Sequence, residues 1–363
     1  MSVARPEGSV VDVHAHAVIP AALELVASEP GFRLEREADL ANFGAETIKN
    51  QQAMLKEIEA LLTDPEQRLE AMDRQGVDIQ LVSPSPAHYH TWADPELARR
   101  IARTVNEGIV RLCAARPERL VGLGLAPIQH PDVAEEALVY SVVELGLKGV
   151  EITTTAPGRE LGDEAYRGFW ARAEELGALV FIHPWGCTLG ERLNRYYLAN
   201  IVGNPVETTV ALSHIIFSGL LDHHPDLRIL AAHGGGYLPF YTGRSDHGWR
   251  IRPEIRTPKE PPSSYLRRLY FDSLVYEPEA LAHLVSRVGA ERVLLGSDFP
   301  FDMGSEDPVE HVRVTPGLKL EEQTAICGTN VTRLLNLDEA CMQRAEDRGA
   351  QHKSPSSRKE AET

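Results

Sequence analysis

Two histidines separated by one residue, His14 and His16, stand at the end of the apolar segment 10–16. Side chains two residues apart on a β-strand point to the same face, so both imidazoles would point to one place. Two imidazoles in this arrangement are typical of a metal site, but a short His-x-His sequence is also common without any function. The other residues that could do chemistry decide between these interpretations.

Three later apolar segments also end in a side chain that can bind a metal or transfer a proton. These side chains are His183, His233 and Asp298, and three glycines follow His233. Histidine nitrogens and a carboxylate oxygen suit a divalent metal, with zinc as the first choice and manganese as the second. We interpret these residues as one functional site, because functional residues of barrel enzymes gather at the C-terminal ends of the strands.

Predicted strands and predicted helices alternate along the whole chain. The eight strands are residues 9–16, 78–83, 120–127, 149–154, 178–184, 228–233, 269–274 and 293–298, and the main helices are 65–76, 95–115, 132–145, 164–176, 206–223, 278–288 and 321–336. Most of the strands are continuous apolar runs, as expected for parallel strands that are buried on both faces. This alternation predicts an α/β fold, a (β/α)8 TIM barrel.

Two connections are longer than a barrel needs. Residues 20–63 are mostly polar and prone to form helix, so we expect a small helical insertion after strand 1, lying over the barrel mouth as part lid and part interface. Residues 234–262, rich in Gly, Arg and Pro, form a second long excursion. We expect one barrel domain over residues 1–337, followed by a polar tail, 338–363, whose composition predicts disorder.

Composition narrows the class of protein. The net charge is −16 and there is no basic run before the tail, which speaks against binding to nucleic acid or to an anionic membrane. The cysteines Cys113, Cys187, Cys327 and Cys341 are far apart, so we expect reduced thiols in a cytoplasmic protein. We expect neither a secretory signal nor a membrane span, which needs ~18 apolar residues.

The predicted barrel would bring the candidate residues together. Strand 8 closes against strand 1 in such a barrel, so the ends of strands 1, 5 and 8 surround one cavity. The expected metal ligands are therefore His14, His16, His183 and Asp298. His233 ends strand 6, where a neutral imidazole could take a proton from a metal-bound water. Asp298 could also move protons, so His233 and Asp298 are the expected catalytic residues.

Several motifs make the chain resemble the amidohydrolase superfamily. Within it, the chain is most similar to the branch of 2-amino-3-carboxymuconate-6-semialdehyde decarboxylase and related nonoxidative decarboxylases. The resemblance covers the first strand and residues 64–337. It rests on Asp-x-His-x-His at 12–16, Leu-Val-Gly-Leu-Gly at 120–124, His-Pro-Trp at 183–185, Pro-x-Glu-Thr-Thr at 205–209, His-Gly-Gly-Gly at 233–236, Gly-Arg-x-x-His-Gly at 243–248 and Gly-Ser-Asp-Phe-Pro-Phe at 296–301.

The resemblance implies roles for individual residues. It assigns a metal to His14, His16, His183 and Asp298, and a general acid/base role to His233. It also implies a homodimer in which Arg244 reaches a substrate carboxylate in the neighbouring subunit's site. The alternative for Arg244 is a salt bridge to a surface acid of its own chain. One metal is expected, because Lys148 opens strand 4, whereas two-metal amidohydrolases carry a carboxylated lysine at its end.

The substrate pocket departs from the pattern of the semialdehyde decarboxylase. That pattern has a substrate-binding arginine shortly before the Asp-Pro-Glu at 64–66, and residues 57–64 contain none here. We therefore expect a different carboxylic acid as substrate. Candidate pocket residues are Trp185 and His247, and candidates to replace the arginine are Lys49, Lys56, His88 and His90.

The predicted site admits more than one reaction. The first hypothesis is a metal-dependent nonoxidative decarboxylase, a carboxy-lyase acting on an aromatic or unsaturated, muconate-type carboxylic acid. The alternative is a hydrolase or hydratase that uses the same metal on an amide, lactone or alkene. A barrel that only binds a ligand is a third possibility, against which the full set of histidines and the aspartate argues. Release of CO₂, rather than incorporation of water, would identify the decarboxylase.

Overall fold

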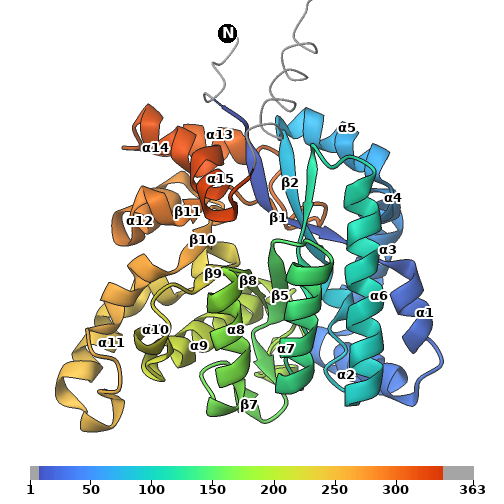
Figure 1. The fold of residues 1–363 in the computed structure, drawn as a ribbon, viewed down its shortest axis with the longest axis horizontal. Helices are drawn as coiled ribbons and strands as arrows, with labels where there is room; N and C mark the ends of the chain where they lie inside the picture. The colour runs from blue at the N-terminus through green and yellow to red at the C-terminus, as the bar shows by residue number, and fades with distance from the viewer. Residues whose placement is uncertain (1–7, 338–363) are drawn as a thin grey trace, which may run out of the picture.

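The strands form a parallel barrel and helices connect them (Figure 1). The computed structural model describes residues 8–337 of the 363 in the chain. The barrel strands are β1 (Val11–Ala17), β2 (Ile79–Pro84), β3 (Leu120–Gly122), β4 (Gly124–Leu125), β5 (Gly149–Thr153), β8 (Leu179–His183), β9 (Arg228–Ala231), β10 (Tyr270–Asp272) and β11 (Val293–Leu294). They pair in parallel in the orders β1-β2-β3 and β11-β10-β9-β8-β5-β4. All eight predicted strands are present, with β3 and β4 as halves of one strand.

Hydrogen bonds join the two sheets at both seams. At one seam the Leu123 amide, between β3 and β4, donates to the Val82 carbonyl on β2 at 2.9 Å. At the other, the Val13 amide on β1 donates to the Leu295 carbonyl after β11 at 2.8 Å, and a parallel bridge continues this pairing. Strand 1 therefore lies beside strand 8, as a (β/α)8 barrel requires.

Apolar side chains alternate between the barrel interior and the layer beneath the helices. Leu179 and Phe181 on β8 are two residues apart, and they share one buried cluster with residues of β1, β2, β9 and β11. Their neighbours Val180 and Ile182 belong to a separate, larger cluster together with helix residues. This alternation follows from the period of two along a strand. It explains why the strand sequences are apolar on both faces.

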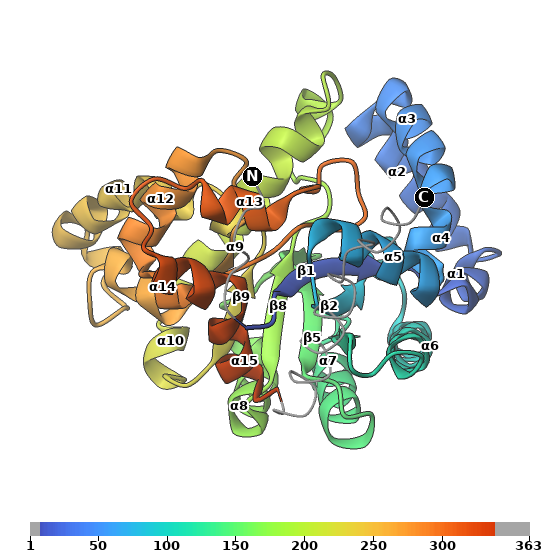
Figure 2. The ribbon, with the colours of Figure 1, turned by 90° about the horizontal axis from the view of Figure 1, so that it is seen from above.

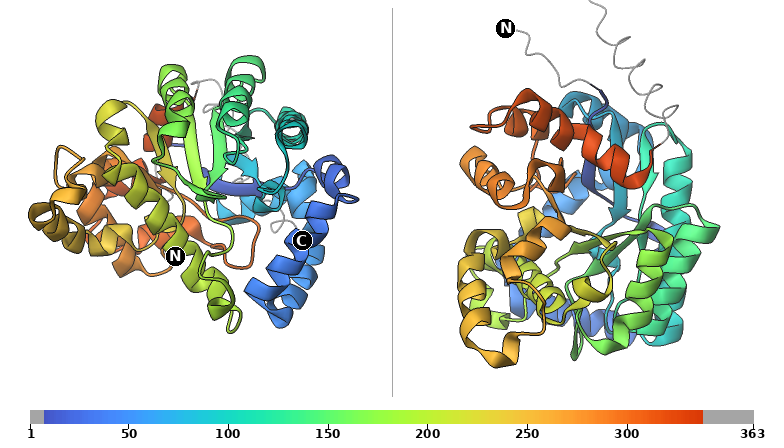
Figure 3. Two further views of the ribbon diagram at one scale, coloured as in Figure 1. Left: turned by 90° about the horizontal axis from the view of Figure 1, so that it is seen from below. Right: turned by 60° about the vertical axis from the view of Figure 1, so that its left-hand side comes forward.

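The helices surround the strands, as the two views of Figure 3 show. After the insertion they are α5 (Pro65–Gln75), α6 (Pro95–Ala114), α7 (Pro131–Val139), α8 (Arg167–Leu176), α9 (Asn204–Phe217), α10 (Leu220–His223), α11 (Leu238–Ile251), α12 (Pro278–Val288), α13 (Pro308–Arg313), α14 (Leu320–Thr324) and α15 (Asn330–Leu335). Helix α5 confirms the predicted helix 65–76, and its start and its end follow from local residues. Asp64 accepts a hydrogen bond from the Glu66 amide, and Gly76 ends the helix in a left-handed conformation.

The insertion after β1 is helical, as predicted. It consists of α1 (Pro20–Val26), α2 (Pro30–Phe43), α3 (Ala45–Glu57) and α4 (Glu59–Thr63). Figures 1 and 2 place α2 and α3 on the opposite side of the barrel from α11. The second long excursion contains helix α11, which its Gly, Arg and Pro content did not indicate. Pro239 lies in the first turn of α11, where its missing N–H costs nothing.

The described residues include three of the four cysteines and all of the helices named above. Cys113, Cys187 and Cys327 are all free thiols. Among residues 8–337, no helix is both long enough and apolar enough to cross a lipid bilayer. The predicted polar tail, with Cys341, lies outside the described residues.

Candidate metal centre

The fold brings His14, His16, His183 and Asp298 to one place. The two histidines of β1, the last residue of β8 and the carboxylate shortly after β11 each offer one ligand atom, and these atoms lie within 4.8 Å of one another. All four residues are buried. The predicted set of metal ligands is therefore assembled by strands that are far apart in the sequence.

The polar atoms of this cluster lack the partners that buried polar atoms normally have. The Nε2 atoms of His14 and His16 are 3.1 Å apart and lie 3.3 and 3.2 Å from Oδ1 of Asp298. Neither ring nitrogen of His183 has a hydrogen-bond partner among the described residues, although both are buried. Oδ1 of Asp298 is also without a hydrogen-bond partner in this part of the chain, and buried nitrogen and carboxylate atoms that lack partners in one cluster fit a cation between them.

The charges of the cluster also favour a cation. Burial disfavours the charged form of His14, but the carboxylates of Asp298 and Asp272 outweigh burial and raise the pKa of His14 to about 10. Burial alone would raise the pKa of Asp298, yet His14 and hydrogen bonds from the histidines hold it well below its usual value. Burial and the neighbouring histidines lower the pKa of His183, so its imidazole is neutral. A metal would take the place of the proton on His14.

The Nδ1 atoms of the two histidines of β1 have polar contacts that orient the rings. Nδ1 of His14 donates to Oδ2 of Asp272 at 2.6 Å, and Nδ1 of His16 is 3.1 Å from the carbonyl oxygen of Pro84. With a proton on each Nδ1, the lone pair of each Nε2 faces the centre of the cluster. This is the arrangement that orients imidazole ligands in metalloproteins.

His233 lies beside the cluster and is more accessible than its members. Its Nε2 is 3.5 Å from Oδ2 of Asp298, and its ring centroid is 5.2 Å from those of His14 and His183. Its side chain is 12% exposed, whereas that of His14 is fully buried. His233 therefore has the position expected of a group that exchanges protons next to a metal.

The backbone around His233 is held in an unusual conformation. His233 has a φ of 53°, and Gly234, Gly235 and Gly236 also have positive φ. A Cβ on Gly235 would approach the ring of Phe271 to 2.6 Å, so both the dihedral angle and the space require glycine there. Non-glycine residues with positive φ are uncommon and often mark functional sites.

Sequence reasoning missed two buried acids next to the cluster. Asp272 ends β10 and is fully buried against His14. Glu151 on β5 is also fully buried; it accepts a hydrogen bond from the hydroxyl of Tyr89 at 2.6 Å, and its Oε2 lies 3.7 Å from Nδ1 of His16. The rule that drew attention to His183 and Asp298, a polar residue at the end of an apolar strand, would also have found Asp272.

The predicted substrate-binding residues lie outside the cluster. Arg244 and His247 are exposed on α11. Trp185, two residues after His183, is 37% exposed, and its ring centroid lies 5.5 Å from that of Phe43 in the insertion. The ion pairs found among residues 8–337 do not include Arg244.

The candidates to replace the missing arginine are not gathered around the cluster either. Lys49 and Lys56 are exposed on α3. His88 is buried and its Nε2 accepts a hydrogen bond from the Ile19 amide at 3.0 Å. His90 is paired with Glu35 through Nδ1 at 2.8 Å. Both histidines thus attach the insertion to the barrel.

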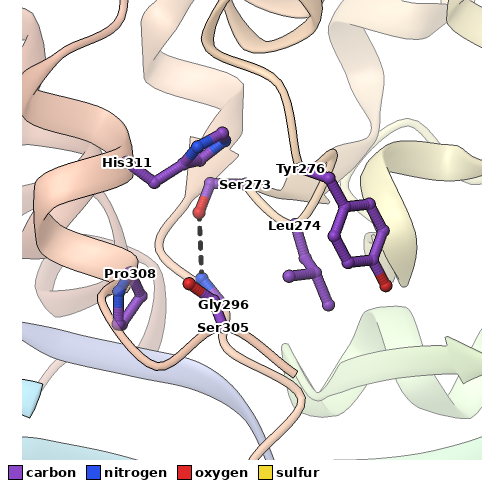
Figure 4. A pocket seen from close by; sticks show the side chains of 7 residues that line it. All are labelled: Ser273, Leu274, Tyr276, Gly296, Ser305, Pro308 and His311. Carbon is purple, nitrogen blue, oxygen red and sulfur yellow. Dashed lines mark hydrogen bonds between the residues drawn. The ribbon is translucent and has the colours of Figure 1, made fainter. Parts of the chain in front are cut away.

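A small cavity of about 100 Å³ lies next to this region (Figure 4). It is lined by Ser273, Leu274, Tyr276, Gly296, Ser305, Pro308 and His311, and none of the clustered ligands lines it. The Gly296 amide donates to the Ser273 hydroxyl at 3.2 Å across it. Because Ser273 follows Asp272 directly, the cavity borders the strand end that supports His14.

Cys113 and Cys187 are poor candidates for a nucleophile at this site. Burial raises the pKa of the Cys113 thiol to about 12. Burial and the nearby Glu207 raise the pKa of the Cys187 thiol to about 11. Thiols with such pKa values stay protonated at neutral pH, so they are poor nucleophiles.

Known proteins share both the sequence pattern and the fold. Residues 11–337 match the sequence profile of the amidohydrolase family. The chain is 35% identical over 285 residues to a 2-amino-3-carboxymuconate-6-semialdehyde decarboxylase of Dictyostelium discoideum, which covers 78% of this chain and 79% of that protein. A solved 2,6-dihydroxybenzoate decarboxylase from Rhizobium superposes with a TM-score of 0.75 at 26% identity, covering 91% of this chain and 99% of that one.

A more distant structure has the same fold. It is a dihydroxybenzoic acid decarboxylase from Polaromonas with bound manganese and an inhibitor, with a TM-score of 0.76 at 22% identity, covering 92% of this chain and 98% of that one. The match to the family profile spans most of the chain and confirms the resemblance drawn from its motifs. The chain belongs to the amidohydrolase family.

Proposed function

We propose that the protein is a metal-dependent nonoxidative decarboxylase of an aromatic or unsaturated, muconate-type carboxylic acid. The observation that carries the proposal is the buried cluster of three imidazoles and one carboxylate with His233 beside it. The decarboxylases among the relatives support carbon dioxide release over hydrolysis, the alternative reaction of the same superfamily.

In this proposal His14, His16, His183 and Asp298 hold one divalent metal. The donor set of three neutral nitrogens and one carboxylate suits zinc, and the manganese in the Polaromonas enzyme makes manganese the other candidate. When bound, the metal would supply a Lewis acid for the substrate's carboxylate or a neighbouring oxygen. No lysine ends β5, which supports one metal rather than two.

His233 is the proposed proton donor. Loss of CO₂ leaves the electron pair of the broken carbon–carbon bond on the substrate, and a proton must be added to that carbon. His233 stands beside the cluster with part of its side chain exposed, so it can deliver a proton and regain one from solvent. Asp298, 3.5 Å from its Nε2, would stabilise the protonated imidazole.

Arg244 is proposed to bind a substrate carboxylate in the partner subunit of a homodimer. Its guanidinium is exposed on α11 and unpaired within residues 8–337, so it is available to another chain. Tyr237, Phe240 and Tyr241 on the same segment are 44, 37 and 70% exposed, which suits a surface that a second subunit covers. His247 follows Arg244 on α11 and is proposed to act with it, whereas Trp185 is proposed to line its own chain's pocket.

The proposal also includes a cover over the barrel mouth and a cytoplasmic location. The insertion α1–α4 would cover the barrel mouth, since Phe43 packs against Trp185 just after β8. The free cysteines support a reducing, cytoplasmic location.

The test is product analysis with purified, metal-loaded protein. The panel contains 2,6-dihydroxybenzoate, other hydroxylated benzoates and muconate-type acids, and the readouts are released CO₂ and incorporation of oxygen from labelled water. CO₂ release from at least one acid, with loss of activity in His233→Ala, is the expected result. Incorporation of labelled oxygen into product without CO₂ would identify the hydrolase or hydratase instead.

A further inference from the structure

We propose that Asp272 is a positioning residue that fixes the metal-binding imidazole of His14 and the catalytic loop of His233 at the same time. The inference rests on the function proposed above. Asp272 ends β10 and is fully buried. Its carboxylate lies between the end of β1 and the loop after β9. It therefore contacts two parts of the site that are far apart in the sequence.

The hydrogen bonds of Asp272 show that both of its carboxylate oxygens act as acceptors. Oδ2 accepts from Nδ1 of His14 at 2.6 Å and from the His233 amide at 2.8 Å. Oδ1 accepts from the amides of Gly234 and Leu274 at 2.7 and 3.2 Å. Four N–H donors therefore point to two oxygens, and only an ionised carboxylate accepts all of them. An asparagine would place an N–H₂ group against at least two of these donors.

The bond to His14 decides which ring nitrogen can bind a metal. Because Asp272 accepts only, the proton of the imidazole is held on Nδ1, and the lone pair of Nε2 faces His16 and Asp298. Without this acceptor the proton could equally occupy Nε2, where it would block the ligand position. Asp272 thus selects the tautomer of His14 that can bind metal.

The bonds to the backbone hold the loop that carries His233. His233 and Gly234 have φ values of 53 and 61°, and both of their amides donate to Asp272. A non-glycine residue in this conformation is strained, and it keeps this conformation only where its surroundings hold it there. Hydrogen bonds to a charged acceptor are stronger than neutral ones, so one buried carboxylate can offset that strain.

Gly296 packs closely against both Asp272 and His14. A Cβ on Gly296 would lie 2.7 Å from Cβ of Asp272 and 3.0 Å from Cβ of His14. The absence of a side chain at Gly296 therefore lets Asp272 and His14 approach each other. The two residues are fixed from the side of β11 as well as by their own hydrogen bond.

The experiment compares Asp272→Asn with a matched control, Asp78→Asn. Asp78 is also a buried acid, 6% exposed, and accepts the Val10 amide at 2.8 Å, but it precedes β2 and so lies at the N-terminal end of the strands, whereas the site lies at their C-terminal ends. Zn²⁺ affinity is measured by competition with a chelator, and kcat and KM are then measured at saturating Zn²⁺ on an acid from the panel. The same preparations are compared in chemical unfolding to separate stability from site effects.

We expect Asp272→Asn to bind Zn²⁺ about 10–100-fold more weakly, the usual effect of losing such a support, while Asp78→Asn binds it as the wild type does. At saturating Zn²⁺, kcat of Asp272→Asn should stay about 10²-fold low with little change in KM, because His233 is misplaced. Wild-type Zn²⁺ affinity in Asp272→Asn, or full recovery of kcat at saturation, would overturn the proposal. If the wild type converts no acid, the proposed function fails, and the Zn²⁺ comparison still decides the role of Asp272.

A measurement on the wild type covers the case in which Asp272→Asn does not fold. Nitrogen chemical shifts of ¹⁵N-labelled imidazoles in the zinc-loaded protein distinguish a protonated from a metal-bound nitrogen. The proposal requires the proton of His14 on Nδ1 and the metal on Nε2. The reverse assignment would exclude Asp272 as the acceptor that orients this ring.

Discussion

At the scale of single residues, the molecule gathers three imidazoles and a carboxylate around one point, and both ring nitrogens of His183 and Oδ1 of Asp298 have no hydrogen-bond partner among residues 8–337. Such an arrangement is costly in a protein that binds nothing there, because buried polar atoms without hydrogen bonds destabilise the folded state. The same arrangement is favourable when one cation binds to a ligand atom of each of the four residues.

The first prediction concerns metal content. Elemental analysis of purified protein should find about one equivalent of divalent metal per chain, as for catalytic sites with three or four protein ligands. His183→Ala should lower this content, since His183 Nε2 and Nδ1 have no other partner among the described residues. Two equivalents per chain would contradict the single site.

The second prediction concerns His233. His233→Ala should keep the metal and the fold, because the one side-chain hydrogen bond of the ring among the described residues is a long one, 3.5 Å to Asp298. Its activity should fall about 10²–10⁴-fold, the usual contribution of a general acid/base. Metal content and circular dichroism are the controls. A loss of metal in proportion to activity would make His233 a ligand instead.

At the scale of elements, the insertion and the barrel are joined by a buried histidine. The Ile19 amide, just before α1, donates to Nε2 of His88, which follows β2. The histidine must be neutral to accept this bond. Burial and the nearby His90 lower the pKa of His88 to about 3.

The third prediction follows from this lowered pKa. A histidine in the unfolded chain has a pKa near 6.5, whereas the pKa of His88 in the folded protein is about 3. Between these two pH values the unfolded chain binds a proton at this residue and the folded protein does not. This residue should therefore lower the free energy of unfolding by about 1.4 kcal/mol per pH unit as the pH falls from 6.5. In His88→Gln, whose amide oxygen can accept the same N–H, urea unfolding between pH 6.5 and 4.5 should show a shallower decline. Equal slopes in the two proteins would place His88 in contact with solvent.

At the scale of the whole molecule, α11 carries an exposed arginine and exposed aromatic residues away from the insertion (Figures 1 and 2). An arginine suits a carboxylate because its planar guanidinium donates two parallel hydrogen bonds. This surface is what a partner subunit would use if each site were completed by the other chain.

The fourth prediction tests the homodimer and the role of Arg244 together. Inactive Arg244→Ala protein is mixed with inactive His233→Ala protein under conditions that allow subunits to exchange. A mixed dimer would contain one site with both residues intact, so partial activity should return. Exchange is followed with differently tagged subunits. Exchange without recovered activity would show that Arg244 serves its own chain or has no role.

The barrel and the four residues of the buried cluster could be predicted from the amino-acid sequence alone. Continuous apolar runs between helices identify parallel strands that are buried on both faces, and this pattern needs no tertiary information. Polar residues at the ends of those runs are equally visible, which is why His14, His16, His183 and Asp298 were all found. Local signals also placed helix α5, because its cap and its final glycine are adjacent to it in the chain.

The groups that support the site could not be predicted from the sequence, because they depend on contacts in the folded chain. The carboxylate of Asp272 meets His14 across 258 residues of chain, and His88 meets Ile19 across 69, and no local pattern encodes such pairs. Helix α11 was not predicted, because its glycines and its proline disfavour helix locally. Tertiary packing overrides these preferences. Strand order and closure fix these contacts, because they set which strand ends become neighbours in space.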